Sequence, residues 1–189
     1  MNKSIKTLTL VAGLVLSGRG LVAAAIHDAA IAGDLDAIKA LIAKRVNLEA
    51  KDKYQKTPLQ YAALNGHLDV VKALLDAKAR VNAKLYDRLT ALDLAAENGF
   101  LDVVELLHSR GGTIGDMALL GAVSGQRSLT NPDGTAGQPE KFDNSDVVQY
   151  LLDNGANPNA EEWGVTALKA ARAYGNANIV NILMKAGAR

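Results

Sequence analysis

Three histidines, His27, His67 and His108, have the most versatile chemistry in this sequence, since imidazole can act as a general base or as a metal ligand. Each of them lies in a different copy of a repeated segment, described below. A catalytic or metal site requires its side chains to converge, whereas stacked repeats hold equivalent positions apart. There is no cysteine, which excludes disulfides and thiolate sites. We therefore expect no catalytic residue, no bound metal and no cofactor.

Other candidate motifs are better explained as local structure. Residues 131–134 (NPDG) resemble part of a calcium loop but lack its later ligands, including the closing Glu, so they indicate a turn. Asp69, Asp102 and Asp146 open predicted helices, where acids cap the helix and compensate its dipole. The sequence has no phosphate-binding glycine loop, nucleophile elbow or zinc-protease motif.

The composition favours packed helices. Hydrophobic residues make up 49% of the chain but aromatic residues only 4%, and Ala and Leu dominate, whereas strands favour aromatic and β-branched residues. The formal net charge of +1 gives no general attraction to nucleic acid or to acidic membranes.

The first 25 residues have the pattern of a signal peptide. Lys3 and Lys6 precede an apolar core at residues 7–16, and Ala23 and Ala25 satisfy the small-x-small rule for cleavage. A membrane anchor is the alternative, but a spanning helix needs about 20 apolar residues and Arg19 interrupts this run. We expect cleavage near Ala25, a periplasmic or secreted protein, and no membrane association after cleavage.

The remainder of the chain repeats with a period of 33 residues. Residues 57–75 (TPLQYAALNGHLDVVKALL), shifted by 33, fall on residues 90–108 (TALDLAAENGFLDVVELLH), and related copies begin at Ile26 and Thr166. Within each copy the apolar spacing predicts two short helices, the first ended by glycine. Helices this short need neighbours to bury their apolar faces. The repeat therefore predicts a stacked solenoid.

These copies closely resemble the ankyrin repeat, whose period is 33 and whose signature is T-P-L-H-x-A. Thr57-Pro58-Leu59 with Ala62 is the clearest match; Gln60 replaces the family's histidine, and His27 occupies that position in the first copy. The resemblance covers residues 26–189. It implies an all-α solenoid of about five helix pairs with β-hairpin fingers at the junctions and a concave surface made by fingers and first helices.

Two departures from the repeat modify this expected solenoid. The junction at residues 109–125 is seven residues short, so one finger is predicted to be missing there. The fourth unit carries an inserted loop, which is either a tolerated surface excursion or a wall beside the binding groove. The expected divisions are a signal peptide at 1–25 and units at 26–51, 52–84, 85–115, 116–160 (with the insertion at 127–145) and 161–189.

In the ankyrin family, contacts with partners usually come from the finger tips and from the end of each first helix. Four of the eight aromatic residues fall on such positions, and Trp and Tyr dominate interface hot spots. The expected partner-binding residues are, in the first finger and helix, Lys53, Tyr54, Lys56, Leu64 and Asn65; in the second, Tyr86, Asp87, Leu89, Glu97 and Asn98; and in the last, Glu162, Trp163, Val165 and Tyr174.

The resemblance and the export signal together lead us to expect a non-enzymatic module that binds another exported protein and is a monomer on its own. An inhibitor or immunity protein that occludes a secreted or periplasmic enzyme, such as a cell-wall hydrolase, fits this combination. Two alternatives stay open: a scaffold or chaperone-like partner of an exported oxidative-defence enzyme, and a binder of a small ligand. An enzyme would need its active site in the insertion, which has no histidine or cysteine.

Overall fold

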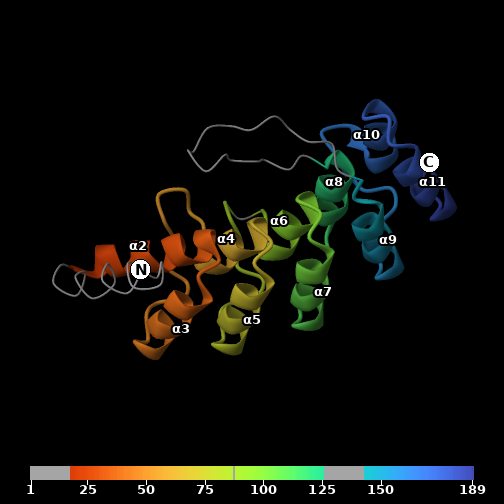
Figure 1. The fold of residues 1–189 in the computed structure, drawn as a ribbon. Coiled ribbons are helices and arrows are strands. Elements are labelled where there is room, and N and C mark those ends of the chain that lie inside the picture. Colours follow the sequence, from red (N-terminus) through yellow and green to blue (C-terminus); the bar gives the residue numbers. More distant parts are fainter. Residues whose placement is uncertain (1–17, 87, 126–142) are drawn as a thin grey trace, which may run out of the picture.

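The computed structural model describes residues 18–86, 88–125 and 143–189, which form a row of helix pairs running from one end of the molecule to the other (Figure 1). The first helices of the pairs are α2 (Gly18–Ala32), α4 (Pro58–Leu64), α6 (Ala91–Glu97), α8 (Asp116–Ser124) and α10 (Ala167–Ala173). The second helices are α3 (Leu35–Ala43), α5 (Leu68–Asp76), α7 (Leu101–Ser109), α9 (Ser145–Asp153) and α11 (Ala177–Lys185). First helices pack on first helices, and second helices on second helices. The predicted all-α solenoid is confirmed.

The threonine of the signature starts the first helices. The side chain of Thr57 accepts a hydrogen bond from the backbone N–H of Gln60, and the side-chain oxygen of Gln60 accepts one from the backbone N–H of Thr57. Thr90 and Asp93 form the same capping box one repeat later. Capping satisfies N–H groups that the first turn leaves without a partner. This local chemistry is why the repeat could be read from the sequence.

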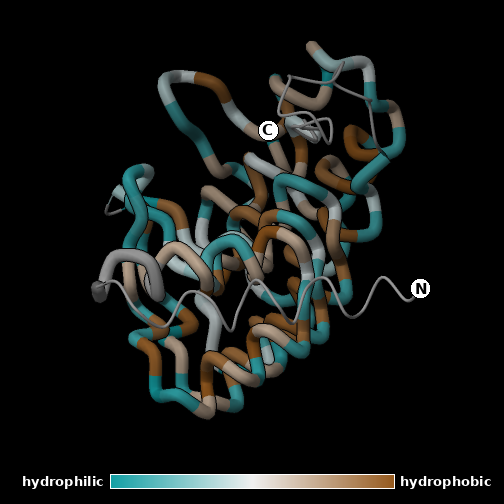
Figure 2. The backbone as a smooth tube through the Cα atoms, turned by 60° about the vertical axis from the view of Figure 1, so that its left-hand side comes forward, coloured by the Kyte–Doolittle hydropathy of each residue, from teal (hydrophilic) through white to brown (hydrophobic). Residues whose placement is uncertain are grey.

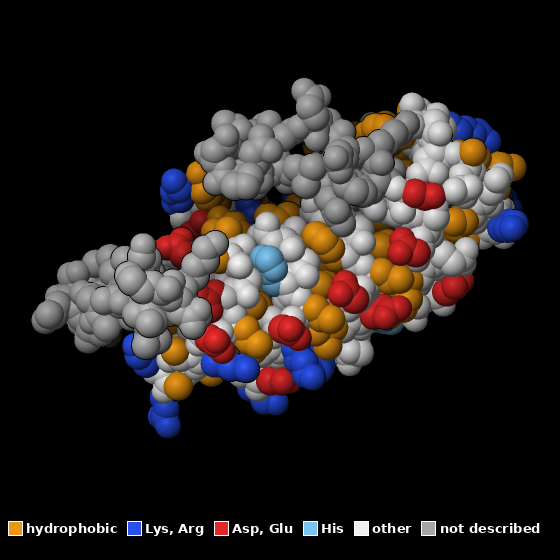
Figure 3. Space-filling view, in the orientation of Figure 1, with side chains coloured by type: hydrophobic (Ala, Val, Ile, Leu, Met, Phe, Trp, Pro, Cys, Tyr) orange, Lys and Arg blue, Asp and Glu red, His pale blue; other side chains and the backbone are white. Residues whose placement is uncertain are grey.

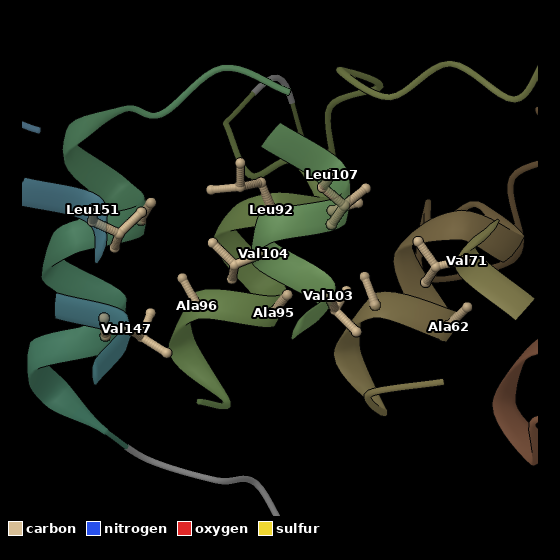
Figure 4. Packing of buried hydrophobic residues seen from close by; sticks show 14 of the residues in the cluster. Ala62, Val71, Leu92, Ala95, Ala96, Val103, Val104, Leu107, Val147 and Leu151 are labelled. Atoms are coloured by element: carbon tan, nitrogen blue, oxygen red, sulfur yellow. The ribbon is translucent and has the colours of Figure 1, made fainter. Parts of the chain in front are cut away.

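The core is a continuous apolar layer between the two rows of helices. Small residues on the first helices let the backbones approach closely, and branched residues of the second helices fill the space between them. Along the tube in Figure 2, hydrophobic and hydrophilic stretches alternate accordingly. Figure 4 shows this packing for Val103, Val104 and Leu107 of α7 beside Leu92, Ala95 and Ala96 of α6. Leu107 is fully buried, so its truncation to alanine would cost ~2–5 kcal/mol.

The repeat glycine brings neighbouring units together. Gly66 follows α4 with a φ of +70°, a left-handed conformation that glycine adopts without strain. A Cβ atom placed on Gly66 would lie 2.4 Å from the ring of Phe100, which starts the second helix of the next unit. Gly66 is thus required both for its backbone conformation and for the close approach of Phe100.

The fingers differ in how much β-structure they contain. Among the residues that the structure describes, only the last finger, residues 154–166, forms a two-stranded hairpin, in which β1 (Glu161–Glu162) pairs with β2 (Val165–Thr166). The second finger, residues 77–90, contains a bridge between Leu85 and Leu89. The first finger, residues 44–57, consists of turns and irregular chain. The solenoid therefore needs only short turns, not full hairpins, at most junctions.

The third junction has no finger, as the sequence predicts. α7 ends at Ser109 and α8 begins at Asp116, so only a short connection lies between them. α8 packs against α6 more extensively than any other pair of helices in the described residues. Gly121 of α8 makes this approach feasible, because a Cβ there would lie 3.2 Å from the Cβ of Glu97.

The insertion in the fourth unit and the predicted signal peptide lie mostly outside the described residues. The insertion joins α8 to α9, and residues 126–142 of it, with the turn at 131–134, are not described. Of the predicted signal peptide only residues 18–25 are described, and α2 continues through Ala25 into the first unit. Among the described residues, no helix has the length and hydropathy needed to cross a membrane.

Candidate protein-binding site

Two buried polar side chains hold the first two fingers in place. The Nε2 atom of His27 lies 2.9 Å from the carbonyl oxygen of Ala50 and 3.1 Å from that of Lys56, both in the first finger. Gln60, 33 residues later, donates from Nε2 to two carbonyls of the second finger at 3.0 and 3.3 Å. Gln60 therefore makes the same kind of contact with the second finger that His27, at the signature histidine position of the first copy, makes with the first finger.

Asp52 shapes the first finger, a role that sequence reasoning missed. Its carboxylate accepts hydrogen bonds from the backbone N–H groups of Tyr54 and Lys56 and from the hydroxyl of Tyr61 at 2.6 Å. Burial alone would raise the pKa of Asp52, but these hydrogen bonds outweigh it and lower the pKa. Burial and the bond to Asp52 raise the pKa of the Tyr61 hydroxyl. An aspartate whose side chain can accept a hydrogen bond from the backbone N–H two residues later is the signal for such a turn.

The aromatic residues of the finger tips are exposed, as expected. Their exposed fractions are 52% for Tyr54, 65% for Tyr86 and 86% for Trp163, and Tyr174 at the end of α10 is 38% exposed. In contrast, Tyr61 is buried. Among the described residues, the exposed aromatics thus lie on the fingers and at the end of a first helix.

Two of these aromatics have an unfavourable backbone conformation. Tyr86 and Trp163 have φ values of +48° and +54°. Trp163 and Gly164 are the two central residues of the last hairpin, and both have positive φ, as in a type I′ turn, which favours Asn-Gly. A left-handed conformation costs a residue with a bulky side chain about 1–2 kcal/mol. Folding therefore gives no reason for tryptophan at this turn.

The first finger combines its aromatic tip with two cations. The Nζ atom of Lys53 lies 4.8 Å from the centre of the Tyr54 ring, and that of Lys56 lies 5.8 Å from it. Such cation–π contacts are worth ~0.5–1 kcal/mol at exposed sites. The tip of the first finger is therefore basic, in contrast to the acidic surface near the last finger described below.

The ends of α4 and α6 are less accessible than expected. Asn98 was predicted to contact a partner, but it is only 4% exposed, and its side chain donates to the carbonyl of Leu94 at 2.8 Å. Asn98 is the C-cap of α6, and this bond occupies one of the last carbonyls of the helix. The expectation that Asn98 offers an accessible contact is wrong. Leu64, Asn65 and Glu97 are half-buried.

The remaining predicted contact residues have varied surroundings. Lys53 and Val165 are exposed, and Lys56, Leu89 and Glu162 are half-buried. Asp87 lies outside the described residues. Whether these side chains contact a partner stays a prediction.

A pocket of about 310 Å³ occupies the place where the third finger is missing. Leu89 of the second finger and Glu162 and Val165 of the last finger line it, and helices α6, α8 and α10 with Tyr174 provide the rest of its wall. Five predicted contact residues line it: Leu89, Glu97, Glu162, Val165 and Tyr174. The sequence predicted the gap, but it gave no sign of the residues that complete the lining, which are Asp93, Met117, Leu120, Gly121, Ser124 and Ala170.

The pocket carries three carboxyl groups. Asp93 occupies the position that His27 and Gln60 hold in earlier units, but no finger follows its unit, so its side chain bonds to Thr90 instead. Burial raises the pKa of Asp93 despite the hydrogen bonds from Thr90, and burial with the neighbouring Asp93 charge raises the pKa of Glu97. The third carboxyl, of Glu162, forms an ion pair with Arg88 of the second finger.

The other two histidines have structural surroundings. Nε2 of His67 lies 2.9 Å from the carbonyl of Ile31 in the preceding unit, and Nδ1 of His108 lies 2.9 Å from the hydroxyl of Tyr150 in the following unit. Each histidine thus connects neighbouring units. Within the part of the chain that the structure describes, no group of three or more His, Cys, Asp or Glu side chains could hold a metal ion.

Acids at the start of the second helices lie within the first turn rather than at the cap. His67, Phe100 and Asn144 are the N-cap residues, and Asp69, Asp102 and Asp146 follow two positions later. They are therefore not N-cap residues, but Asp102 and Asp146 accept hydrogen bonds from the first-turn N–H groups of Val103 and Val147, and compensation of the helix dipole also fits their position. Figure 3 shows acidic, basic and apolar side chains interleaved over one face of the molecule.

Comparison with known proteins identifies the repeats. A family model described as ankyrin repeats (3 copies) matches residues 26–117, and one described as an ankyrin repeat matches residues 140–162. Together they cover more than half of the chain. The search of curated proteins finds no match. The helix pair α10 and α11 lies beyond both matched ranges and is placed by the structure.

Ankyrin repeats are protein–protein interaction modules and are generally non-enzymatic. The matches, the 33-residue period and the stacked helix pairs agree, and the chain therefore belongs to the ankyrin-repeat family.

Proposed function

We propose that this chain is an exported, non-enzymatic protein that binds another exported protein and covers its functional surface. An inhibitor or immunity protein of a secreted or periplasmic enzyme, such as a cell-wall hydrolase, would act in this way. The observation that carries the proposal is the exposure of Tyr54, Tyr86 and Trp163 on the finger tips. Large aromatic side chains on rigid projections provide contact area at low entropic cost, and they dominate hot spots.

The backbone at Trp163 supports the same proposal. Its left-handed conformation means that tryptophan lowers the stability of the fold at this position. We infer that the side chain is present for binding. Strained positions concentrate at functional sites. Export is supported by the charged, apolar and small-residue pattern of residues 1–25.

The test is a pull-down from the cell envelope with the C-terminally tagged full chain, followed by an activity assay on each protein recovered. N-terminal sequencing of the purified chain checks cleavage near Ala25. We expect a secreted or periplasmic enzyme whose activity falls when the chain binds. A bound enzyme that stays active would instead support the scaffold or chaperone-like alternative, and recovery of no exported protein would contradict the proposal.

Variants of the finger tips make the test specific. Trp163→Asn and Tyr86→Asn suit the left-handed backbone, so we expect them to fold normally and to weaken partner binding by ~1–4 kcal/mol. Met184→Ala is the control, because Met184 is also exposed but lies on α11, away from the fingers. Unchanged affinity in both finger variants would contradict a finger-tip interface.

A further inference from the structure

The pocket at the missing finger has the mixed chemistry of a site for a long basic side chain. Its volume of about 310 Å³ lies at the small end of ligand pockets, which range over ~300–1,000 Å³, so it holds little more than one side chain. Leu89, Leu120 and Val165 provide apolar wall, and Asp93 and Glu97 provide carboxylates. Basic side chains bury an aliphatic stem beside apolar groups and present their charge to acids.

Asp93 has an unused acceptor in this pocket. The residue is only 6% exposed. Its Oδ2 atom accepts hydrogen bonds from the N–H and the hydroxyl of Thr90, each at 2.7 Å. Within the described part of the chain, its Oδ1 atom accepts none. The described residues contain no fully buried side-chain oxygen that lacks a hydrogen-bond partner, so this Oδ1 atom is accessible and can accept a hydrogen bond from a donor that enters the pocket.

Glu97 adds a second acceptor next to Asp93. In the described residues its carboxylate forms no ion pair or hydrogen bond, and it is half-buried at the end of α6. Burial raises the pKa of Asp93, and the charge of Lys84 opposes this only in part; Lys84 is itself exposed. The interior of the pocket therefore keeps an excess of negative charge.

Arg88 shows that a guanidinium group can pair with an acid of this pocket. Its guanidinium comes from the second finger and pairs with Glu162, which also lines the pocket. The same guanidinium lies 3.7 Å from the sulfur of Met117, another lining residue. The chain thus places one of its own cations, Arg88, beside the pocket. Arg88 pairs with Glu162, so the carboxylates of Asp93 and Glu97 can still pair with a second cation.

We infer that this pocket receives an arginine side chain from the bound protein, with its guanidinium between Asp93 and Glu97. A planar guanidinium donates in several directions at once and also stacks on aromatic rings, and Tyr174 lines the same pocket. The inference rests on the proposed function, since the arginine belongs to the protein that the fingers bind. It goes further by naming the chemistry that the partner must present.

The first test uses a probe that needs no knowledge of the partner. N-acetyl-arginine-N-methylamide is titrated into the ¹⁵N-labelled protein, and amide chemical shifts are followed by NMR. We expect saturable shifts at Gly121 and Ala170, both of which line the pocket, with a Kd on the order of 1–10 mM, as for a single weakly bound side chain. The citrulline analogue has nearly the same shape without the charge. Equal binding of citrulline, or no shift at the pocket, would overturn the inference.

Variants separate the pocket from general charge effects. Glu97→Gln should weaken arginine binding about fivefold, whereas Glu105→Gln, an exposed acid on α7, should leave it unchanged. Arg88→Gln removes the competing cation and frees Glu162, so it should tighten binding by about two- to fivefold. Weaker binding in Arg88→Gln, or equal effects of the two glutamate variants, would contradict the inference.

A metal ion is the other cation to be tested. Calcium chloride that displaces the arginine probe, when sodium chloride at the same ionic strength does not, would overturn the inference in favour of a metal site. The probe experiment is independent of the pull-down. An arginine-binding pocket without an exported partner would contradict the proposed function alone, and a partner whose affinity is unaffected by Glu97→Gln would contradict this inference alone.

Discussion

Arg88 and Glu162 form an ion pair that joins the second finger to the last finger across the position of the missing one. The two residues are 74 positions apart in the chain. α8 packs closely on α6, and this approach brings the two flanking fingers within reach of each other. The absence of one finger therefore creates both the pocket and the contact beside it.

This ion pair should contribute little to stability. The side chains of Arg88 and Glu162 are 52% and 30% exposed, and exposed pairs are worth ~0.2–1 kcal/mol. We expect a double-mutant cycle with Arg88→Gln and Glu162→Gln, measured by urea unfolding, to give a coupling energy within that range that falls as salt is added. A coupling above about 2 kcal/mol would mean that the pair holds the two fingers together energetically.

Gln60 should be replaceable by histidine but not by alanine. Gln60→Ala leaves the carbonyls of Ala83 and Leu89 without their donor and should lower the free energy of unfolding by ~1–3 kcal/mol. Gln60→His should retain most of the stability, because His27 makes the equivalent contacts in the preceding unit. Chemical denaturation of the two variants compares them directly, and equal losses would show that the finger does not depend on this donor.

Gly66 should tolerate substitution far less than Gly155. Both have positive φ, of +70° and +92°, so alanine incurs backbone strain of about 1 kcal/mol at either position. At Gly66 a Cβ would also collide with the ring of Phe100, whereas at Gly155 nothing lies within 4 Å. We expect Gly66→Ala to lose about 1–3 kcal/mol more than Gly155→Ala in thermal unfolding, as for overpacked cores. Equal losses would mean that Phe100 moves aside freely.

Glu97→Gln should stabilise the protein at neutral pH. Burial, assisted by the charge of Asp93, raises the pKa of Glu97 in the folded state above its unfolded value. The associated stability is present below the unfolded pKa and is lost as the pH rises through the folded pKa. At pH 7 the wild type therefore carries a penalty that glutamine lacks, and we expect the Tm to rise by up to about 2–4 °C.

The pH dependence provides the control for this prediction. The advantage of Glu97→Gln should shrink as the pH falls into the ordinary glutamic acid range, where both proteins are uncharged at this position. Glu105→Gln, at an exposed acid, should not change the Tm at either pH. An advantage for Glu97→Gln that is independent of pH would attribute it to packing and not to charge.

The sequence by itself determined the helix pairs and the places where the repeat departs from its pattern. The capping boxes at Thr57 and Thr90 and the apolar spacing act over a few residues, so they can be recognised without knowing the fold. Counting residues between repeat positions was sufficient to locate the missing finger and the insertion. Likewise, the tips of the fingers are exposed in any stacked arrangement, which made Tyr86 and Trp163 predictable as surface aromatics.

Only the tertiary structure decided which side chains come together where the third finger is missing. A repeat pattern specifies which face of each helix is apolar, but not how far α8 moves toward α6 once the finger between them is lost. That distance brings Asp93, Glu97 and Glu162 to one pocket and pairs Glu162 with Arg88. It likewise takes three-dimensional packing to bury Asn98, a residue that its position in the repeat suggested was accessible. Contacts between residues far apart in the chain depend on such distances, and local sequence patterns do not encode them.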